Sequence, residues 1–207
     1  MELDLKQKRR MLDDGYVVIA GVVSRDLIDE ALREINHRLG LRYQTLDADA
    51  AARDSWSDDV DAPAIMDLLH KSPLWELAQS LSGGGRLDGP ATGRIVLRFP
   101  AVNDSHGGLA SRSDGFSAPN ANKMIGCFTM LIGILLSDAP DKHMGNLTVY
   151  PGTHRPSARR TEAAQITGKA GDIVLCHCRL AHGEERNLSH TIGYMAYWRL
   201  RHKDAGS

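Results

Sequence analysis

The chain has 207 residues, 42% hydrophobic and 25% charged, a composition typical of a folded domain that excludes a disordered chain. This length favours one domain, which we expect to span residues 1–207. The Lys and Arg count of 25 nearly balances 26 Asp and Glu, so a net charge of -1 argues against coating nucleic acid or an anionic membrane. The 3 cysteines are too few for a disulfide scaffold and favour a reducing, cytoplasmic location.

The first half of the sequence predicts helices. Apolar residues at helical spacing predict four of them, over residues 3–12, 24–39, 64–71 and 73–81. Gly15 and Gly40 are expected to end the first two, because glycine readily adopts the left-handed cap conformation. The β-branched run 16–20 predicts a short strand, and the polar segment 41–62 predicts a loop.

The second half predicts antiparallel strands separated by turn residues, over 94–99, 125–136, 146–150, 172–178 and 192–200. Helices followed by antiparallel strands indicate an α+β chain or a β-barrel with helices along one side. The three glycines at 83–85 follow a helix and lack the Lys-Ser/Thr ending of a phosphate loop, so we expect a connector there. No run is long and apolar enough to span a bilayer, since the longest, 124–136, is interrupted by glycines.

Two segments of the second half carry specific motifs. Residues 145–154 read GNLTVYPGTH, a strand running into a tight turn, and residues 171–183 read GDIVLCHCRLAHG, which predicts a second strand ending at His182. A polar turn, Asn187-Leu-Ser189, precedes the last strand. Together these segments resemble the phytanoyl-CoA dioxygenase family of the iron(II)/2-oxoglutarate oxygenase superfamily. The DGYVVI segment at 14–19 is similar to the entry segment of the same family, so the resemblance spans most of the chain.

The resemblance implies a mainly β fold, a double-stranded β-helix (jelly-roll, cupin-like) with supporting N-terminal helices. In that barrel two histidines and one carboxylate hold iron and leave positions open for 2-oxoglutarate and dioxygen. The first histidine and the carboxylate come as His-x-Asp, since residues i and i+2 share one side of a strand. An arginine that follows the second histidine clamps the far carboxylate of 2-oxoglutarate.

Carried over by position, the resemblance gives a mixed result. The second histidine corresponds to His182 and the carboxylate to Asp114, but Arg112 occupies the first histidine position and Gly193 the arginine position. Arginine stays protonated and has no lone pair for a metal, so Arg112 would pair with Asp114 instead. Gly193 offers no charge and indicates a bulge or a close approach, with room for a ligand larger than 2-oxoglutarate. Fe(II) and 2-oxoglutarate, which the resemblance implies, are therefore expected to bind weakly or not at all.

Several residues offer a rescue of these positions. His106 is a candidate substitute ligand, and Asp114 and His182 would be metal ligands only if a metal binds. Three cations are candidates for the co-substrate clamp, namely Arg94, Arg98 and Lys123. On one continuous strand His177 would face away from His182 unless a bulge intervenes.

Three functions remain open from the sequence. The first is a small-molecule tailoring enzyme in which Arg112, Asp114 and His182 perform acid–base chemistry such as cyclisation, isomerisation or elimination. The second is an iron(II)/2-oxoglutarate hydroxylase with substitute ligands, and the third is a binding or partner subunit that keeps only the fold. Purely structural roles also remain open, with His182 a barrel histidine, Asp114 a turn cap and Arg112 facing solvent. The expected partner is a small-molecule substrate, and the oligomeric state is open.

Overall fold

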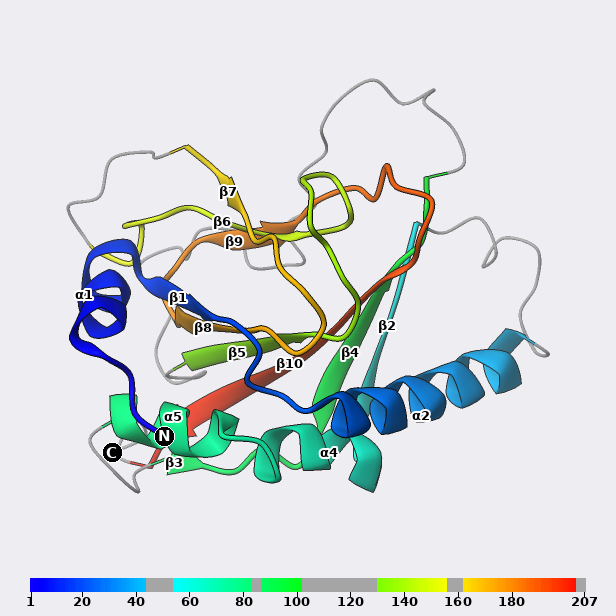
Figure 1. Ribbon diagram of the computed structural model, residues 1–207, viewed down its shortest axis with the longest axis horizontal. Helices are drawn as coiled ribbons and strands as arrows, with labels where there is room; N and C mark the ends of the chain where they lie inside the picture. The colour runs from blue at the N-terminus through cyan, green and yellow to red at the C-terminus, as the bar shows by residue number, and fades with distance from the viewer. Residues whose placement is uncertain (44–53, 83–86, 102–129, 156–161, 204–207) are drawn as a thin grey trace.

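The computed structural model describes residues 1–43, 54–82, 87–101, 130–155 and 162–203. Two antiparallel sheets face each other (Figure 1). The helices are α1 (Leu5–Asp14), α2 (Arg25–Tyr43), α4 (Pro63–His70) and α5 (Leu74–Leu81). Helices α2, α4 and α5 cover the outer side of the larger sheet, and α1 lies beside its strands β1 (Tyr16–Ile19) and β8 (Ile173–His177) (Figure 1). This arrangement confirms the predicted double-stranded β-helix with supporting helices.

The larger sheet has 7 strands in the order β1-β8-β5-β10-β4-β2, with β3 paired to β10. Its strands are β1 (Tyr16–Ile19), β2 (Ser55–Val60), β3 (Leu87–Asp88), β4 (Gly93–Arg98), β5 (Met130–Leu135), β8 (Ile173–His177) and β10 (Gly193–His202). The smaller sheet has 3 strands in the order β7-β6-β9. They are β6 (Leu147–Val149), β7 (Ala164–Gln165) and β9 (His182–Glu184).

Side-chain alternation along the strands divides the core in two. Outward residues of the larger sheet, such as Ile95 and Trp198, pack with helical residues such as Ile28 and Leu68 in one buried cluster. Inward residues form a second cluster between the sheets, made of Tyr16, Val96, Leu131, Leu135, Leu147, Val149, Ile166, Val174, Cys176, Leu180, Met195 and Tyr197. Because successive side chains of a strand point to opposite faces, every second residue of β4, β9 and β10 faces the space between the sheets.

Three element predictions are wrong. The segment 55–60 is strand β2 rather than a loop, because it pairs along its whole length with β4. Helix α2 continues past Gly40 to Tyr43, since the roughly 1 kcal/mol that an interior glycine costs relative to alanine is small beside the burial of Ile28 and Ile35. The segment that ends at His182 is two strands, β8 and β9, joined by a turn.

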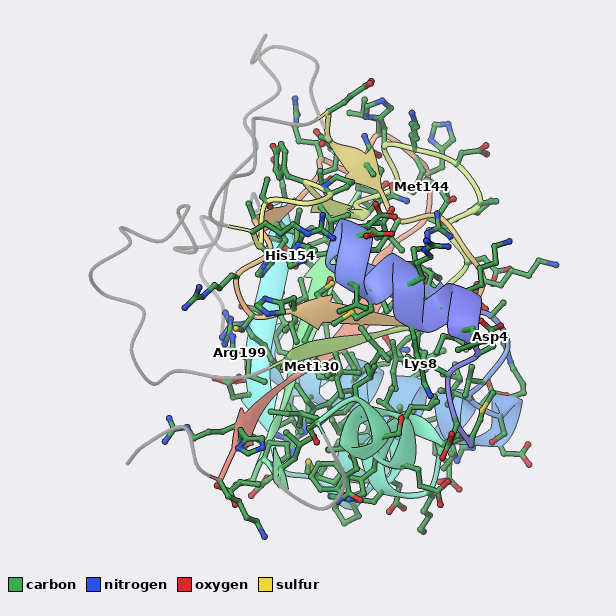
Figure 2. All side chains as sticks on the ribbon, turned by 90° about the vertical axis from the view of Figure 1, so that its left-hand side faces the viewer. Asp4, Lys8, Met130, Met144, His154 and Arg199 are labelled. Atoms are coloured by element: carbon green, nitrogen blue, oxygen red, sulfur yellow. The ribbon has the colours of Figure 1, made fainter. Side chains whose placement is uncertain are left out.

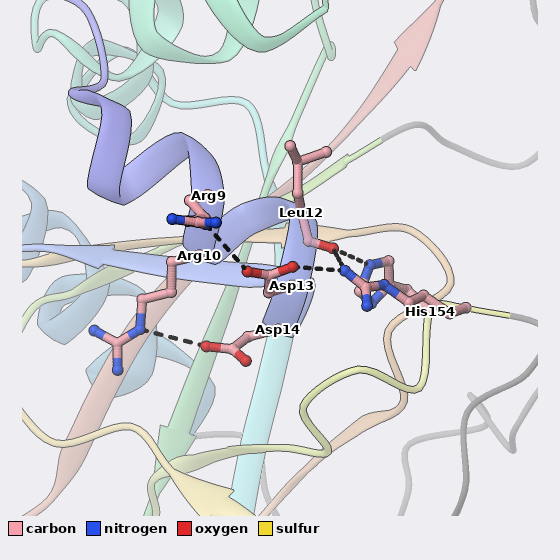
Figure 3. Close-up of polar contacts among 7 residues, drawn as sticks. Arg9, Arg10, Leu12, Asp13, Asp14 and His154 are labelled. Atoms are coloured by element: carbon pink, nitrogen blue, oxygen red, sulfur yellow. Dashed lines mark hydrogen bonds and ion pairs between the residues drawn. The ribbon is translucent and has the colours of Figure 1, made fainter.

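The predicted end of the first helix is confirmed. Gly15 adopts the left-handed conformation with φ 81°, and its N–H donates to the Met11 carbonyl. Figure 2 shows α1 running from Asp4 at one end towards His154 near the other. His154 Nε2 and the Arg155 guanidinium both donate to the Leu12 carbonyl, at 3.1 and 2.5 Å (Figure 3). The end of the GNLTVYPGTH motif therefore supplies donors to the carbonyl end of α1, which such donors stabilise.

No helix within the described ranges is long and apolar enough to cross a membrane.

Candidate active site

Two adjoining hollows open between the sheets, and both are lined by Val96, Glu184 and Tyr197. We call the first the His182 hollow; it also includes Arg94 and Arg199, and its empty volume is about 430 Å³, part of it open to solvent. We call the second the Gly193 hollow; it also includes Arg98 and Met144, and its empty volume is about 360 Å³, again partly open to solvent. Together they place histidine, arginine and glutamate side chains against an apolar wall, as small-molecule sites do.

His182 lies on β9 opposite Val149 of β6, and its ring faces the His182 hollow. Burial lowers the pKa of the His182 imidazole; the hydrogen bond to Leu180 opposes this shift, and the positive charge of Arg199 adds to it. The ring Nδ1 lies 2.8 Å from the Leu180 carbonyl oxygen. Because a carbonyl only accepts, Nδ1 carries the proton, and the neutral ring presents Nε2 as its basic nitrogen.

Arg98 is brought into the barrel by the pairing of β4 with β10, in which it stands opposite Gly193. A Cβ added at Gly193 would lie 2.9 Å from the Met144 carbonyl oxygen. Gly193 therefore marks a close approach, one of the two predicted roles, while the pairing of β10 with β4 continues from it without a bulge. Of the two predicted clamp cations that the structure describes, Arg94 and Arg98, the register sets Arg98 against Gly193.

The Arg98 guanidinium forms an ion pair with the Glu184 carboxylate across the two sheets. Their side chains are 13% and 10% exposed, so the pair is almost completely withdrawn from water. Sequence reasoning missed Glu184. The signal was available, because Glu184 follows His182 by two residues and alternation puts both on one face of a strand.

Arg94 also lines the His182 hollow, but its guanidinium is engaged with the neighbouring strand β2. It donates to Ser57 Oγ at 3.0 Å and lies 3.6 Å from the Asp59 carboxylate. Arg199, which lines the same hollow, is exposed.

The remaining predicted site residues, Arg112, Asp114, Lys123 and His106, lie outside the described residues. Their assignments stay predictions from the sequence.

His177 does not share a strand with His182, contrary to the premise of its predicted orientation. It ends β8, its N–H donates to the Gly15 carbonyl, and its ring lies 5.2 Å from that of His154, centroid to centroid. Burial lowers the pKa of His177, and the positive charges of His154 and Arg179 lower it further. His177 therefore belongs to the attachment of α1 and does not line either hollow.

The described residues allow a test of how well iron and 2-oxoglutarate would fit. Within the described ranges no group of three or more His, Cys, Asp or Glu side chains is arranged to hold a metal ion. The inner face offers His182 and Glu184 as donors, and Glu184 is already paired with Arg98. A dicarboxylate placed against Gly193 would meet a guanidinium that an internal carboxylate neutralises. At this position the described residues therefore do not fit 2-oxoglutarate.

The paired sheets, the helices on one outer side and the inward histidine define a double-stranded β-helix protein of the cupin-like class. The family model described as phytanoyl-CoA dioxygenase (PhyH) matches residues 11–192. The chain therefore belongs to the phytanoyl-CoA dioxygenase family. No curated protein sequence matches it.

Several solved structures share the fold. AviO1 from Streptomyces viridochromogenes Tue57 is 21% identical over 98% of this chain and 96% of its own, with a TM-score of 0.67. SnoK, a non-heme alpha ketoglutarate dependent carbocyclase from nogalamycin biosynthesis, is 19% identical over 96% and 83%, with a TM-score of 0.67. HygX from Streptomyces hygroscopicus, with nickel, 2-oxoglutarate and hygromycin B bound, is 17% identical over 98% and 88%, with a TM-score of 0.66. At these identities the similarity shows a common fold.

Proposed function

We propose that this chain is an enzyme that converts a small organic molecule between the two sheets by acid–base chemistry, without the oxidative iron(II)/2-oxoglutarate reaction. The reaction type would be a cyclisation, an isomerisation or an elimination. SnoK, which is described as alpha ketoglutarate dependent, supports only the kind of product, because a carbocyclase is built on the same fold. HygX supports the kind of ligand, because its structure holds a small molecule. The match over residues 11–192 supports one domain as the acting unit.

The state of His182 carries the proposal. Its lowered pKa favours the neutral ring at pH 7, and the Leu180 carbonyl keeps the proton on Nδ1. A neutral imidazole held in one tautomer is suited to take a proton at Nε2 and to return it later in the reaction. The apolar residues of the hollow, Val96, Leu131 and Leu147, lower the local dielectric beside His182, which strengthens interactions between nearby charges.

Two further roles are assigned from sequence position. Asp114 would be the second acid–base group, and Arg112 would stabilise negative charge that develops on the substrate. The same substitution of arginine for histidine removes a metal ligand from the family's pattern, since a guanidinium has no lone pair to donate. These roles make Arg112→His an informative variant, with iron affinity as its readout.

An iron(II)/2-oxoglutarate hydroxylase is the second candidate, and Arg98 is the observation that favours it. This cation reaches the inner face opposite Gly193, so it could hold a co-substrate carboxylate from β4 instead of β10. In that case Glu184 would have to leave Arg98 when the co-substrate binds. His106 or another donor would also have to complete the metal site.

Metal analysis of protein purified without chelator, combined with a succinate-release assay, separates the two candidates. We expect iron well below one equivalent and no substrate-dependent succinate. Stoichiometric iron together with substrate-dependent succinate would refute the acid–base proposal. A screen of small molecules for turnover then tests catalysis itself, with His182→Asn expected to abolish the conversion. His190→Asn is the matched control, because the same change is made at an exposed histidine.

A further inference from the structure

The Arg98 side chain enters the barrel through space that Gly145 leaves open, whereas a side chain at Gly193 would make only ordinary contact with it. A Cβ added at Gly145 would lie 2.5 Å from the Arg98 Cβ, and one added at Gly193 would lie 3.6 Å from it. Gly145 also has φ 77°, a conformation that favours glycine. Any larger residue at position 145 would push the arginine stem away, so the local backbone is built to admit it.

The backbone of Arg98 is held in place as well. Asn187 Nδ2 donates to the Arg98 carbonyl at 2.8 Å and to the Thr191 carbonyl at 2.7 Å. Asn187 is 2% exposed, and its Oδ1 accepts from the Ser189 N–H, so the amide ties the end of β4 to the turn before β10. This polar turn, which the sequence already singled out, thus positions the one arginine that stands opposite Gly193.

On the opposite sheet, Glu184 is placed to meet that arginine. It pairs with Leu147 across β9 and β6, and its carboxylate contacts the Arg98 guanidinium where both side chains are nearly buried. A charge withdrawn from water is strongly unfavourable unless an opposite charge and hydrogen bonds compensate it. Glu184 therefore depends on Arg98, and a ligand that took Arg98 would leave the Glu184 carboxylate buried without compensation.

We propose that Glu184 is a specificity-determining residue that excludes dicarboxylates from this barrel. Its carboxylate occupies the position beside the Arg98 guanidinium that a ligand carboxylate would need. The inference rests on the proposed function and makes its ligand class narrower: the substrate reaches His182 without an acidic group directed at the Gly193 hollow. A ligand carboxylate that displaced Glu184 would gain only the interaction free energy with Arg98 that Glu184 loses. The exchange therefore brings no net attraction and leaves one extra buried negative charge.

Calorimetric titration with glutarate, in the absence of divalent metals, tests this role directly. Glutarate carries two carboxylates and cannot use its 2-position to chelate a metal, so binding reports on the anion site alone. We expect no saturable binding to the wild type and clear binding to Glu184→Gln, tighter by about tenfold to a hundredfold, as for a hydrogen bond to a charged group. Arg98→Met added to Glu184→Gln should abolish the gained binding.

Glu185→Gln is the matched control, because it changes the net charge equally at the neighbouring buried residue and leaves the Arg98–Glu184 pair intact. It should bind glutarate no better than the wild type. Wild-type binding equal to that of Glu184→Gln would overturn the proposal, and so would a folded Glu184→Gln protein that binds no glutarate.

Should Glu184→Gln fail to fold, Glu184→Ala tests the same site by rescue. Acetate is expected to raise the melting temperature of this variant more than that of the wild type, by restoring a carboxylate next to Arg98, and equal effects would contradict the proposal. The acid–base function and the role of Glu184 can be refuted by different results. Succinate release by iron-loaded wild type refutes the acid–base function, whereas metal-free glutarate binding by wild type refutes only the role of Glu184.

Discussion

The ion pair between Arg98 and Glu184 gives the sharpest test of the structure, because it joins two sheets deep inside the barrel. We consider Arg98→Met, Glu184→Leu and the double variant, which replace charge with apolar volume. Removing one member of a buried pair costs roughly 3–5 kcal/mol, because the remaining charge loses an opposite charge in a place withdrawn from water. With about 2–4 °C per kcal/mol for a domain of 150–250 residues, each single variant should melt about 6–20 °C below the wild type.

The double variant should behave differently, because no charge is left buried. Replacing a buried pair by apolar side chains of similar volume is often neutral or stabilising by about 1–4 kcal/mol, so we expect a stability close to that of the wild type. Urea unfolding of all four proteins, followed by circular dichroism, yields the coupling free energy of the pair. Additive losses in the double variant, with a coupling near zero, would show that the two side chains do not interact.

Three other outcomes are expected. Gly15→Ala should lower the free energy of unfolding by roughly 1–3 kcal/mol, since φ is 81° and the new Cβ would lie 2.4 Å from His154 Nδ1. At Gly21 φ is 65° and no atom lies within 4 Å of an added Cβ, so Gly21→Ala in the same urea titration should show only the loss due to backbone strain. The free energy of unfolding should fall as the pH drops below the ordinary histidine pKa of 6.5, because the lowered pKa of His182 in the folded protein lets the unfolded chain bind more protons. His182→Asn should make this pH dependence less steep, and an unchanged pH dependence would contradict the prediction. Burial raises the pKa of the Cys176 thiol to about 12, so a thiol reagent at pH 8 should label it only after unfolding, as read by peptide mass spectrometry.

A buried pair of this kind also has a consequence for how substrates are chosen. Charged side chains that satisfy each other inside a site leave neutral surface for the ligand and penalise a ligand that brings its own charge. Here the pair lies beside the hydroxyl-bearing ring of Tyr197, which lines both hollows. The barrel thus combines a polar but neutralised end at Gly193 with a basic imidazole at His182.

Much of the molecule follows from the sequence alone. Helical spacing of apolar residues predicted the helices that the structure describes, and Gly15 ends the first of them as expected. The GNLTVYPGTH and GDIVLCHCRLAHG segments indicated the family, which the family model confirms. His182 lines a hollow between the sheets, and its role as a site residue stays a prediction. These features are local, or depend on a pattern within one segment, so the sequence determines them without knowledge of the neighbours.

The tertiary structure decided the rest, because it depends on which strands pair and in what register. The polar segment 55–60 becomes a strand only because β4 offers it an edge. Arg98 stands opposite Gly193 only through the register of β4 with β10, and it meets Glu184 only because the smaller sheet closes over the larger one. These partners are far apart along the chain, and nothing in their local sequences specifies the distance between them. The long-range pairing therefore determines which cation faces the hollow and which anion neutralises it.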